Sequence, residues 1–295
     1  MNKTKWISAH IYYNELDVII RESLTTLLND EGFSVLTEKY FFIRYWDRGA
    51  HIRLRVLVRN ENEHSVSELI NNHFNTFFRK VPSLDFNRYP TFFPNNSIQY
   101  IQYIPELKRY GGETGILIAE NHFYDSSQFV IKLQQPRSKG KIGINVDDKM
   151  SLAIRGNLMM IKSMKMKKPD ENNFVFRLSS NLFWKEKLEE FIPKDQLEHK
   201  LELDYKKNSE QLKKLYRYVV DLEIDGSDKL FNEFCNALEN TRLEICNNIS
   251  TISSVSRQDL YASYLHMFNN RIGLRNHEEY YLYSMIKKTY DEVYI

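Results

Sequence analysis

The chain has 295 residues but only 2 cysteines, 10 glycines and 7 prolines, and several common motifs are absent. There is no Walker A motif and no G-x-G-x-x-G after a predicted strand, so ATP or NAD dependence is not expected and no cofactor is predicted. The 8 histidines show no H-E-x-x-H and no Cys/His zinc spacing, so no metal site is predicted. A G-x-S-x-G nucleophile elbow is also missing. The chemistry must therefore use Arg, His, Tyr or acidic side chains.

The chain also lacks the apolar segments that direct a protein to or across a membrane. No run approaches the ~18 apolar residues of a membrane span, and the N-terminus has no signal-peptide core. Lys and Arg number 41 against 39 Asp and Glu, a net charge of +2 that gives no bulk attraction to nucleic acid or membrane. Cys235 and Cys246 fall in one predicted helix, about 16 Å apart along its axis and too far for a disulfide with each other. These features predict a cytoplasmic protein without direct nucleic-acid or membrane contacts.

The residues that are present suffice for a large core, since 42% are hydrophobic and 14% aromatic. In the first half of the chain, period-2 alternation predicts two strands flanking an arginine-rich hairpin, over Trp6–Tyr13 and Ser97–Ile104. Helices are expected in the same half with Asn14 as N-cap and Gly32 as stop, over Glu63–Arg79, and after Gly112 as far as Asp125.

The second half of the chain turns helical from Lys185 onward. Four helices are predicted, over Gln211–Leu222, Lys229–Cys246, Arg257–Arg271 and His277–Val293. The expected N-caps of the last three are Ser227, Ser256 and Asn276. Loops are expected over Ser138–Gly143 and Met164–Asp170. The pattern predicts an α+β fold, a twisted antiparallel sheet with packed helices and a helical C-terminal third, in a single domain over 1–295.

The most informative segment is Phe41–Val56, FFIRYWDRGAHIRLRV, which places four arginines and a histidine around one tight turn. Alternation in its second strand puts the apolar residues on a core-facing side and His51, Arg53 and Arg55 on the other. Alternate residues of a strand lie about 6.5 Å apart, so Arg53 and Arg55 could grip two carboxylates of one small molecule.

The loop of this hairpin sets its register. The composition of Asp47–Ala50 predicts a short turn, which would place Trp46 opposite His51 and Arg44 opposite Arg53. Two guanidinium groups that face each other are unfavourable unless an anion or carboxylate lies between them. We therefore interpret the segment as an anion-binding hairpin. An exposed edge strand with solvated arginines is the alternative that the sequence leaves open.

Two later segments carry further candidate residues. The first, YIPELKRYGG, ends at Gly112 and sets Arg109 beside a Gly-Gly turn, where backbone N–H groups can approach a ligand. The second, SYLHMFNNR, places His266 on a late predicted helix. Both segments have a purely structural alternative, in which Arg109 pairs with Glu106 or Glu120 and the histidine is a satisfied helix residue.

Together these segments resemble the C-terminal, glutamate-eliminating part of LanB-type lantibiotic dehydratases and the free-standing thiopeptide-type bacteriocin biosynthesis proteins. The resemblance rests on three motifs in order: F-F-I-R-Y-W-D-x-G-x-H-I-R-L-R, then E-x-x-R-Y-G-G with A-E-x-x-F-x-D-S, and finally H-M-x-x-N-R. Between Gln134 and Ser256 little resemblance is found, so the resemblance to this family depends on the segments before Gln134 and after Ser256.

The resemblance implies β-elimination of glutamate from glutamylated Ser or Thr of a ribosomally made precursor peptide. The product is dehydroalanine or dehydrobutyrine, in lantibiotic or thiopeptide biosynthesis. The family's glutamate-holding arginines match Arg53 or Arg55 and Arg109, and its catalytic histidine matches His266, whose role as base or acid is left open. The residues expected to bind substrate are Arg44, His51, Tyr103 and Tyr110.

The resemblance also implies partners. These are the precursor peptide, with its leader and glutamylated core, and a separate protein that glutamylates the core from glutamyl-tRNA. A homodimer is left open. Two other functions compete with elimination: the pyridine-forming cycloaddase of thiopeptide pathways, on the same scaffold, and a non-catalytic scaffold that binds the precursor. Neither handles a departing glutamate, so the retained arginines and histidine favour elimination.

Overall fold

The computed structural model describes residues 3–85, 89–134, 149–180, 187–220, 228–252 and 255–293. Its contacts divide the chain into two compact units. Unit 1 comprises Met1–Leu107 and Ile116–Pro136, and unit 2 comprises Lys108–Gly115 and Arg137–Ile295. That 1–295 forms a single domain stays a prediction.

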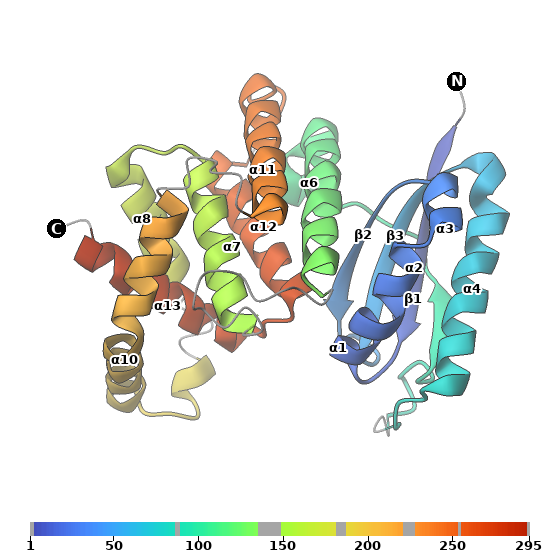
Figure 1. Ribbon diagram of the computed structural model, residues 1–295, viewed down its shortest axis with the longest axis horizontal. Coiled ribbons are helices and arrows are strands. Elements are labelled where there is room, and N and C mark those ends of the chain that lie inside the picture. The colour runs from blue at the N-terminus through green and yellow to red at the C-terminus, as the bar shows by residue number, and fades with distance from the viewer. Residues whose placement is uncertain are drawn as a thin grey trace. The chain divides into compact units, whose positions relative to one another are not determined.

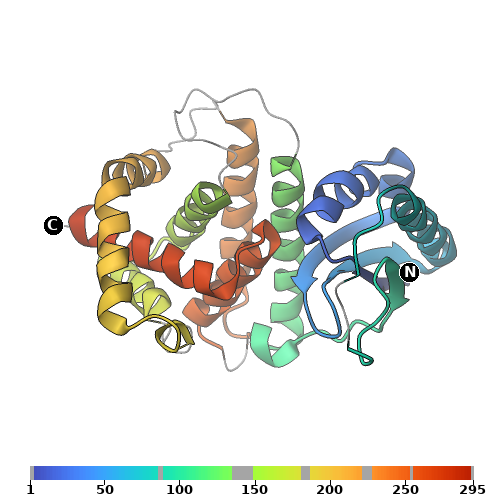
Figure 2. The ribbon, with the colours of Figure 1, turned by 90° about the horizontal axis from the view of Figure 1, so that it is seen from below.

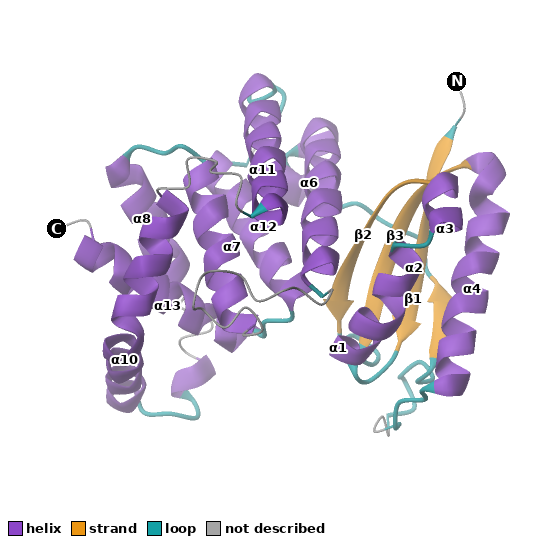
Figure 3. Ribbon diagram, viewed as in Figure 1, coloured by secondary structure: helices purple, strands orange, loops and turns teal. Residues whose placement is uncertain are grey.

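Unit 1 contains an antiparallel sheet of four strands in the order β2-β3-β1-β4 (Figure 3). The strands are β1 (Thr4–Tyr12), β2 (Thr37–Tyr45), β3 (His51–Arg59) and β4 (Ser97–Tyr100). The arginine-rich hairpin is thus β2 and β3, and β3 lies in the interior of the sheet between β2 and β1. β4 ends at Tyr100, before the predicted Ile104. The predicted α+β class with an antiparallel sheet and a helical C-terminal part is confirmed.

Short helices and one long helix cover one face of this sheet (Figures 1 and 2). They are α1 (Leu16–Ile19), a π-helical turn (Ile20–Leu24), α2 (Thr25–Leu28), α3 (Glu31–Leu36) and α4 (Glu63–Lys80), the last preceded by a 3-10 turn (Asn60–Asn62). The core between helices and sheet is aliphatic and aromatic; its fully buried residues include Ala9, Ile11, Leu54, Val56, Val58, Ile19, Ile20, Leu24, Val66, Ile70 and Phe74.

The prediction of a single helix between Asn14 and Gly32 is wrong in two respects. Asn14 does not cap it, because its side chain donates to the Leu84 carbonyl at 2.6 Å. Gly32 does not end it, because a new helix, α3, has already begun at Glu31, with the Asp30 carboxylate accepting from the Phe33 N–H at 2.8 Å. A short polar N-cap therefore restarts the chain where the glycine was expected to stop it.

Helix α6 (Gly112–Leu133) protects the outer edge of the sheet. It follows α5 (Leu107–Tyr110), runs beyond the predicted Asp125, and lies along β2 in Figure 1. The Ser127 hydroxyl accepts a hydrogen bond from the Phe42 backbone N–H at 3.3 Å, and Lys39 donates to Asn121 at 2.5 Å. The helix therefore occupies a backbone N–H of this edge strand that would otherwise be free to pair with another strand.

Unit 2 is helical throughout its described residues. Its helices are α7 (Lys149–Ser163), α8 (Lys168–Ser179), α10 (Lys194–Val220), α11 (Lys229–Asn247), α12 (Arg257–Ile272) and α13 (Asn276–Val293). Helix α7 contacts α10, α11, α12 and α13 (Figure 1). The approach to α12 is close, because a Cβ added at Gly156 would lie 2.3 Å from the Phe268 ring.

Sequence patterns located some of these helices better than others. Three of the predicted helices match α11, α12 and α13 to within about one residue at each end. Ser256 caps α12 as predicted, whereas Asn276 is already helical. Helix α7 was not predicted, α10 begins well before Gln211, and α8 takes up the end of the loop expected over Met164–Asp170. Ser227 and the loop expected over Ser138–Gly143 lie outside the described residues. None of the helices described is long and apolar enough to cross a membrane.

Candidate functional site

The sheet face opposite α1–α4 carries the predicted basic residues of β3. His51, Arg53 and Arg55 alternate with buried aliphatic residues, as predicted. The alternative of an exposed edge strand is wrong, because β3 lies inside the sheet and Arg55 is only 7% exposed. Arg55 is therefore part of the interior of unit 1 and not of a solvated edge, and Arg53 beside it is half-buried.

The predicted register of the hairpin is wrong by one residue. Arg44 lies opposite Ile52, and Ile43 lies opposite Arg53. The reason is the five-residue loop between the strands, in which Arg48 and Gly49 both have positive φ. Arg44 therefore points to the helix-covered face, where it is buried and paired with Asp17 at 2.5 Å. Arg44 therefore lies on the opposite face of the sheet from Arg53 and Arg55.

His51 links the hairpin loop to Arg53. Its Nδ1 lies 2.8 Å from the Gly49 carbonyl oxygen, which can only accept, so Nδ1 carries the proton. Its Nε2 then accepts a hydrogen bond from Arg53 Nε at 3.2 Å. The Arg53 guanidinium also lies over the Tyr45 ring, 3.4 Å from its centroid. The loop glycine thus fixes the histidine tautomer, and the histidine in turn fixes the arginine.

Arg55 lies deeper, against an aromatic wall. Its guanidinium is 5.3 Å from the Tyr103 ring centroid, and Tyr103 packs edge-on against Trp6 and Phe41. Burial, followed by the nearby Arg53 charge, lowers the pKa of Arg55 to about 10. Its Nε and Nη1 are buried without a hydrogen-bond partner, and within the described ranges neither it nor Arg53 has an ion-pair partner.

Tyr103 and a second histidine, His10, also lie beside the arginines of this face. The Tyr103 hydroxyl bonds to Glu120 of α6, a carboxyl whose pKa burial raises. His10 of β1 lies opposite Arg53 and stacks on His51 with ring centroids 5.0 Å apart. Burial is the main cause that lowers the pKa of His10 to about 3 and that of His51 to about 4, and the arginines of β3 add to both shifts. Both imidazoles are therefore neutral near pH 7.

Unit 2 holds the other predicted residues. Arg109 of α5 donates from Nε to the Ser263 hydroxyl of α12 at 3.2 Å. Tyr110 is buried and stacks on Tyr264, with ring centroids 6.0 Å apart. The predicted Gly-Gly turn follows directly, with φ of 81° at Gly111 and 90° at Gly112. Helix α12 therefore positions the arginine and the tyrosine of the R-Y-G-G motif through neighbouring residues.

His266, also on α12, pairs with a carboxylate that the sequence did not indicate. Its Nδ1 lies 2.8 Å from Glu279 Oε2 of α13. The other carboxylate oxygen accepts from the Asn269 amide at 2.9 Å and from the Tyr283 hydroxyl at 3.1 Å. Asn269 in turn accepts from Asn157 of α7 at 2.6 Å. The glutamate is buried and held from three sides, whereas the His266 side chain is 42% exposed.

The predicted site residues therefore fall into two groups. Unit 1 brings together His51, Arg53, Arg55 and Tyr103, and unit 2 brings Arg109, Tyr110 and His266 onto or against α12. The sequence reasoning did not select Ser8 and His10, although alternation along β1 places both on the face of Arg53 and Arg55.

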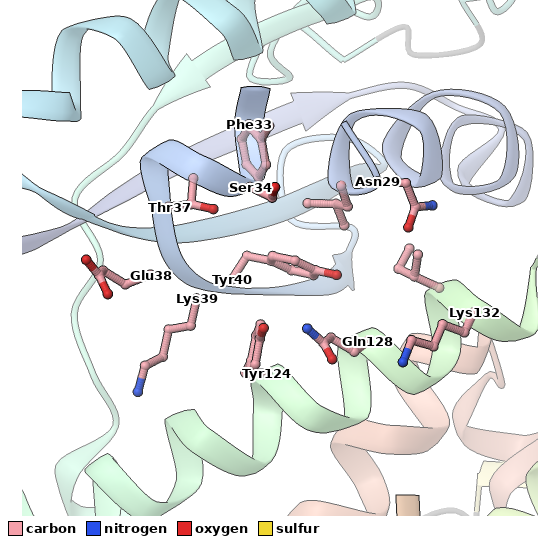
Figure 4. A pocket seen from close by; sticks show the side chains of 12 residues that line it. Asn29, Phe33, Ser34, Thr37, Glu38, Lys39, Tyr40, Tyr124, Gln128 and Lys132 are labelled. Atoms are coloured by element: carbon pink, nitrogen blue, oxygen red, sulfur yellow. The ribbon is translucent and has the colours of Figure 1, made fainter. Parts of the chain in front are cut away.

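A cavity of about 160 Å³ lies elsewhere in unit 1, between α2, α3, the start of β2 and α6 (Figure 4). Tyr40 and Tyr124 meet edge-on in its lining, with ring centroids 5.4 Å apart, and burial raises the pKa of both phenols. None of the predicted site residues lines this cavity. Among the residues described there is also no group of three or more His, Cys, Asp or Glu that could hold a metal ion.

These features define an α+β protein with a buried, arginine-lined sheet face and a helical unit that presents a histidine–glutamate pair. The chain belongs to the family of the lantibiotic biosynthesis dehydratase C-terminal domain, whose model matches residues 6–290. No curated protein sequence matches it.

Solved structures show the same fold at low sequence identity. The pyridine synthase TbtD from thiomuracin biosynthesis is 14% identical with a TM-score of 0.78, and the match covers 98% of this chain and 99% of that one. The tRNA-dependent lantibiotic dehydratase MibB from Microbispora sp. 107891 is 16% identical with a TM-score of 0.71. Here the match covers 98% of this chain but 28% of the dehydratase. TsrL is 13% identical with a TM-score of 0.59, and 99% and 95% of the two chains are covered.

Proposed function

We propose that the chain catalyses β-elimination of glutamate from a glutamyl ester of Ser or Thr in a ribosomally made precursor peptide. The observation that carries the proposal is the buried Arg55, which has donors without acceptors and lies next to Arg53 on the same strand face. Two guanidiniums without a counter-anion in the described residues are suited to bind a leaving group that gains negative charge. Membership in the dehydratase C-terminal family supports the same chemistry.

The arginines act on the departing glutamate. In the elimination a base removes the α-proton of the esterified residue, its electron pair forms the Cα=Cβ bond, and the Cβ–O bond breaks. Glutamate leaves with a new α-carboxylate in addition to its side-chain carboxylate. Guanidiniums that bind this second charge more strongly as it develops lower the barrier. Arg109, oriented by Ser263, serves this role in unit 2, and Arg53 and Arg55 hold the glutamyl group in unit 1.

His266 handles the proton. Because the Glu279 carboxylate only accepts, the bond at Nδ1 leaves the lone pair of the neutral imidazole on Nε2, which is the form that a general base requires. Glu279 is then a positioning residue, and Asn269 and Tyr283 hold its other oxygen in place. We assign His51, Tyr103 and Tyr110 to substrate binding, either by orienting the guanidiniums or by contacting the substrate directly.

The substrate is a long peptide, and its glutamyl ester is formed before the elimination. This chain spans 28% of the length of the lantibiotic dehydratase that it matches. As the family resemblance implies, we assign glutamylation from glutamyl-tRNA to a separate protein, and we expect the precursor to be recognised through its leader and its glutamylated core. Elimination then consumes the product of an acyl transfer from an aminoacyl-tRNA.

Mass spectrometry of a glutamylated precursor peptide incubated with the purified protein tests this function. We expect loss of glutamate and appearance of the dehydro residue. Arg55→Leu and His266→Ala should abolish the reaction, whereas Arg59→Leu on the same strand should not, because Arg59 is exposed and paired with Glu38. Wild-type elimination by the Arg55 or His266 variant would refute the assigned roles.

A pyridine-forming cycloaddition is the second candidate, favoured by the end-to-end match with the pyridine synthase. That reaction releases no glutamate, so it would not require the guanidiniums of Arg53 and Arg55. A peptide that already carries two dehydroalanines distinguishes the two functions, since a cycloaddase would form the pyridine and release the leader. Leader binding with neither activity would support a non-catalytic scaffold.

A further inference from the structure

The basic face of the sheet contains more polar groups without partners than Arg55 alone. On β1, Ser8 lies opposite Arg55 and His10 lies opposite Arg53. The Ser8 hydroxyl and both ring nitrogens of His10 are buried without a hydrogen-bond partner, as are Nε and Nη1 of Arg55. Ser8 is 6% exposed and His10 is 4% exposed. Five buried polar atoms on three neighbouring residues are therefore unsatisfied in the part of the chain that the structure describes.

Such a concentration is unusual, because the great majority of buried polar atoms in folded proteins have a partner. The unsatisfied atoms belong to side chains on two interior strands, and the pairing of these strands fixes the backbone that carries them. Elsewhere in unit 1 the half-buried His73 is satisfied, with its Nε2 3.1 Å from the Ser23 hydroxyl. The unsatisfied group on β1 and β3 therefore indicates that a molecule other than the chain itself supplies the partners.

The chemistry of the group specifies the ligand. A guanidinium only donates hydrogen bonds, a hydroxyl can donate one, and a neutral imidazole can donate one. A carboxylate accepts from all of these and also compensates the charge of two guanidiniums that lack an ion-pair partner in the described residues. A carboxamide of the same shape would turn an NH₂ group toward these donors and would bring no negative charge.

We propose that Ser8 and His10 complete, with Arg53 and Arg55, a site for the side-chain carboxylate of the glutamyl group, and so select glutamyl over glutaminyl esters. This inference rests on the proposed elimination. An ester made from an aminoacyl-tRNA is joined through the α-carbonyl, so the side-chain carboxylate is the negative charge that the glutamyl group carries before the reaction. The site therefore acts on the substrate itself and distinguishes it from its uncharged isostere.

Two precursor peptides that differ only in a glutamyl or a glutaminyl ester at one serine test the selectivity. We expect the wild type to prefer the glutamyl ester by about 100-fold in kcat/KM, since sites built to bind a polar group strongly reject an analogue that mismatches it. Ser8→Ala and His10→Phe should each reduce this ratio by about tenfold. Phe retains a ring to stack on His51 in place of His10. His73→Phe is the matched control and should leave the ratio unchanged.

A binding measurement separates this inference from the elimination. The imidazole signal of His10, identified by its absence in His10→Phe, should move when glutarate is added to the wild type and not when glutaramide is added. If neither ester reacts but glutarate moves this signal, the elimination fails and the carboxylate site stands. If elimination proceeds and Ser8→Ala and His10→Phe lower the rates on both esters equally, the two residues serve only the fold and the inference is overturned.

Discussion

Acid is expected to destabilise unit 1 through the two stacked histidines, and His10→Phe should remove about half of this effect. In the folded chain the pKa of His10 is lowered to about 3 and that of His51 to about 4, chiefly by burial. In the unfolded chain both groups take up a proton near the ordinary histidine pKa of about 6.5. Between these values the unfolded state binds more protons, so the free energy of unfolding falls as the pH falls.

The magnitude follows from the two pKa values. Between about pH 7 and about pH 4.5, His10 alone should lower the free energy of unfolding by about 2.5 kcal/mol, and His51 by a similar amount. The figure for His10 depends little on how far below pH 4.5 its folded-state pKa lies, because the folded imidazole stays neutral over the whole interval. The loss is large relative to the typical stability of a domain.

Urea titrations of the wild type and of His10→Phe at about pH 7 and about pH 4.5 measure the effect. The relevant quantity is the change in the free energy of unfolding between the two pH values, so any loss that the variant suffers at both cancels. We expect this change to be smaller by about 2.5 kcal/mol in the variant. An equal change in both proteins would show that His10 is not held neutral by the fold, and would refute the reasoning.

Three further results are expected from single substitutions. Arg55→Leu should abolish elimination while raising the free energy of unfolding by about 1 kcal/mol, because it removes a buried charge with unsatisfied donors; urea titration at neutral pH measures this, and a loss of stability would contradict it. Gly156→Ala should lower the free energy of unfolding by about 2 kcal/mol, since its Cβ would meet the Phe268 ring at 2.3 Å, and an unchanged melting temperature would show that the ring moves freely aside. Glu279→Gln should slow elimination about 100-fold, because its single amide oxygen cannot accept from His266 and from Asn269 at once; single-turnover kinetics can measure this, and wild-type turnover would rule out the positioning role.

The sequence predicted the strand faces of unit 1 better than their pairing. Period-2 alternation placed His51, Arg53 and Arg55 on one side of β3, since this pattern depends only on backbone geometry. The predicted register was wrong because the composition of the loop did not show that it has five residues instead of four. Two of these residues, Arg48 and Gly49, have positive φ. A shift of one residue moved Arg44 to the opposite face of the sheet.

Partners that come from distant segments were harder to predict. The alternation of β1 already placed Ser8 and His10 on one face, but their relation to Arg53 and Arg55 depends on the pairing of β1 with β3, which no local signal specifies. Glu279 reaches His266 only through the packing of α13 against α12, and in the sequence it is an ordinary acidic residue in the first turn of a helix. Motifs therefore indicated the candidate residues Arg53, Arg55 and His266, whereas the groups that contact them could be found only from the fold.

Two arginines of unit 1 show why a missing partner is more informative than burial. Arg44 is 4% exposed and Arg55 is 7% exposed, and burial lowers the pKa of both. Arg44 is bonded to the Asp17 carboxylate, so its charge is compensated within the chain and its burial requires no ligand. Arg55 faces Ser8 across the strands, and both residues have buried polar atoms without partners. Since leaving a charged donor buried and unsatisfied is costly, the fold retains at Arg55 a cost that a bound carboxylate would offset, which is the argument for placing the substrate there.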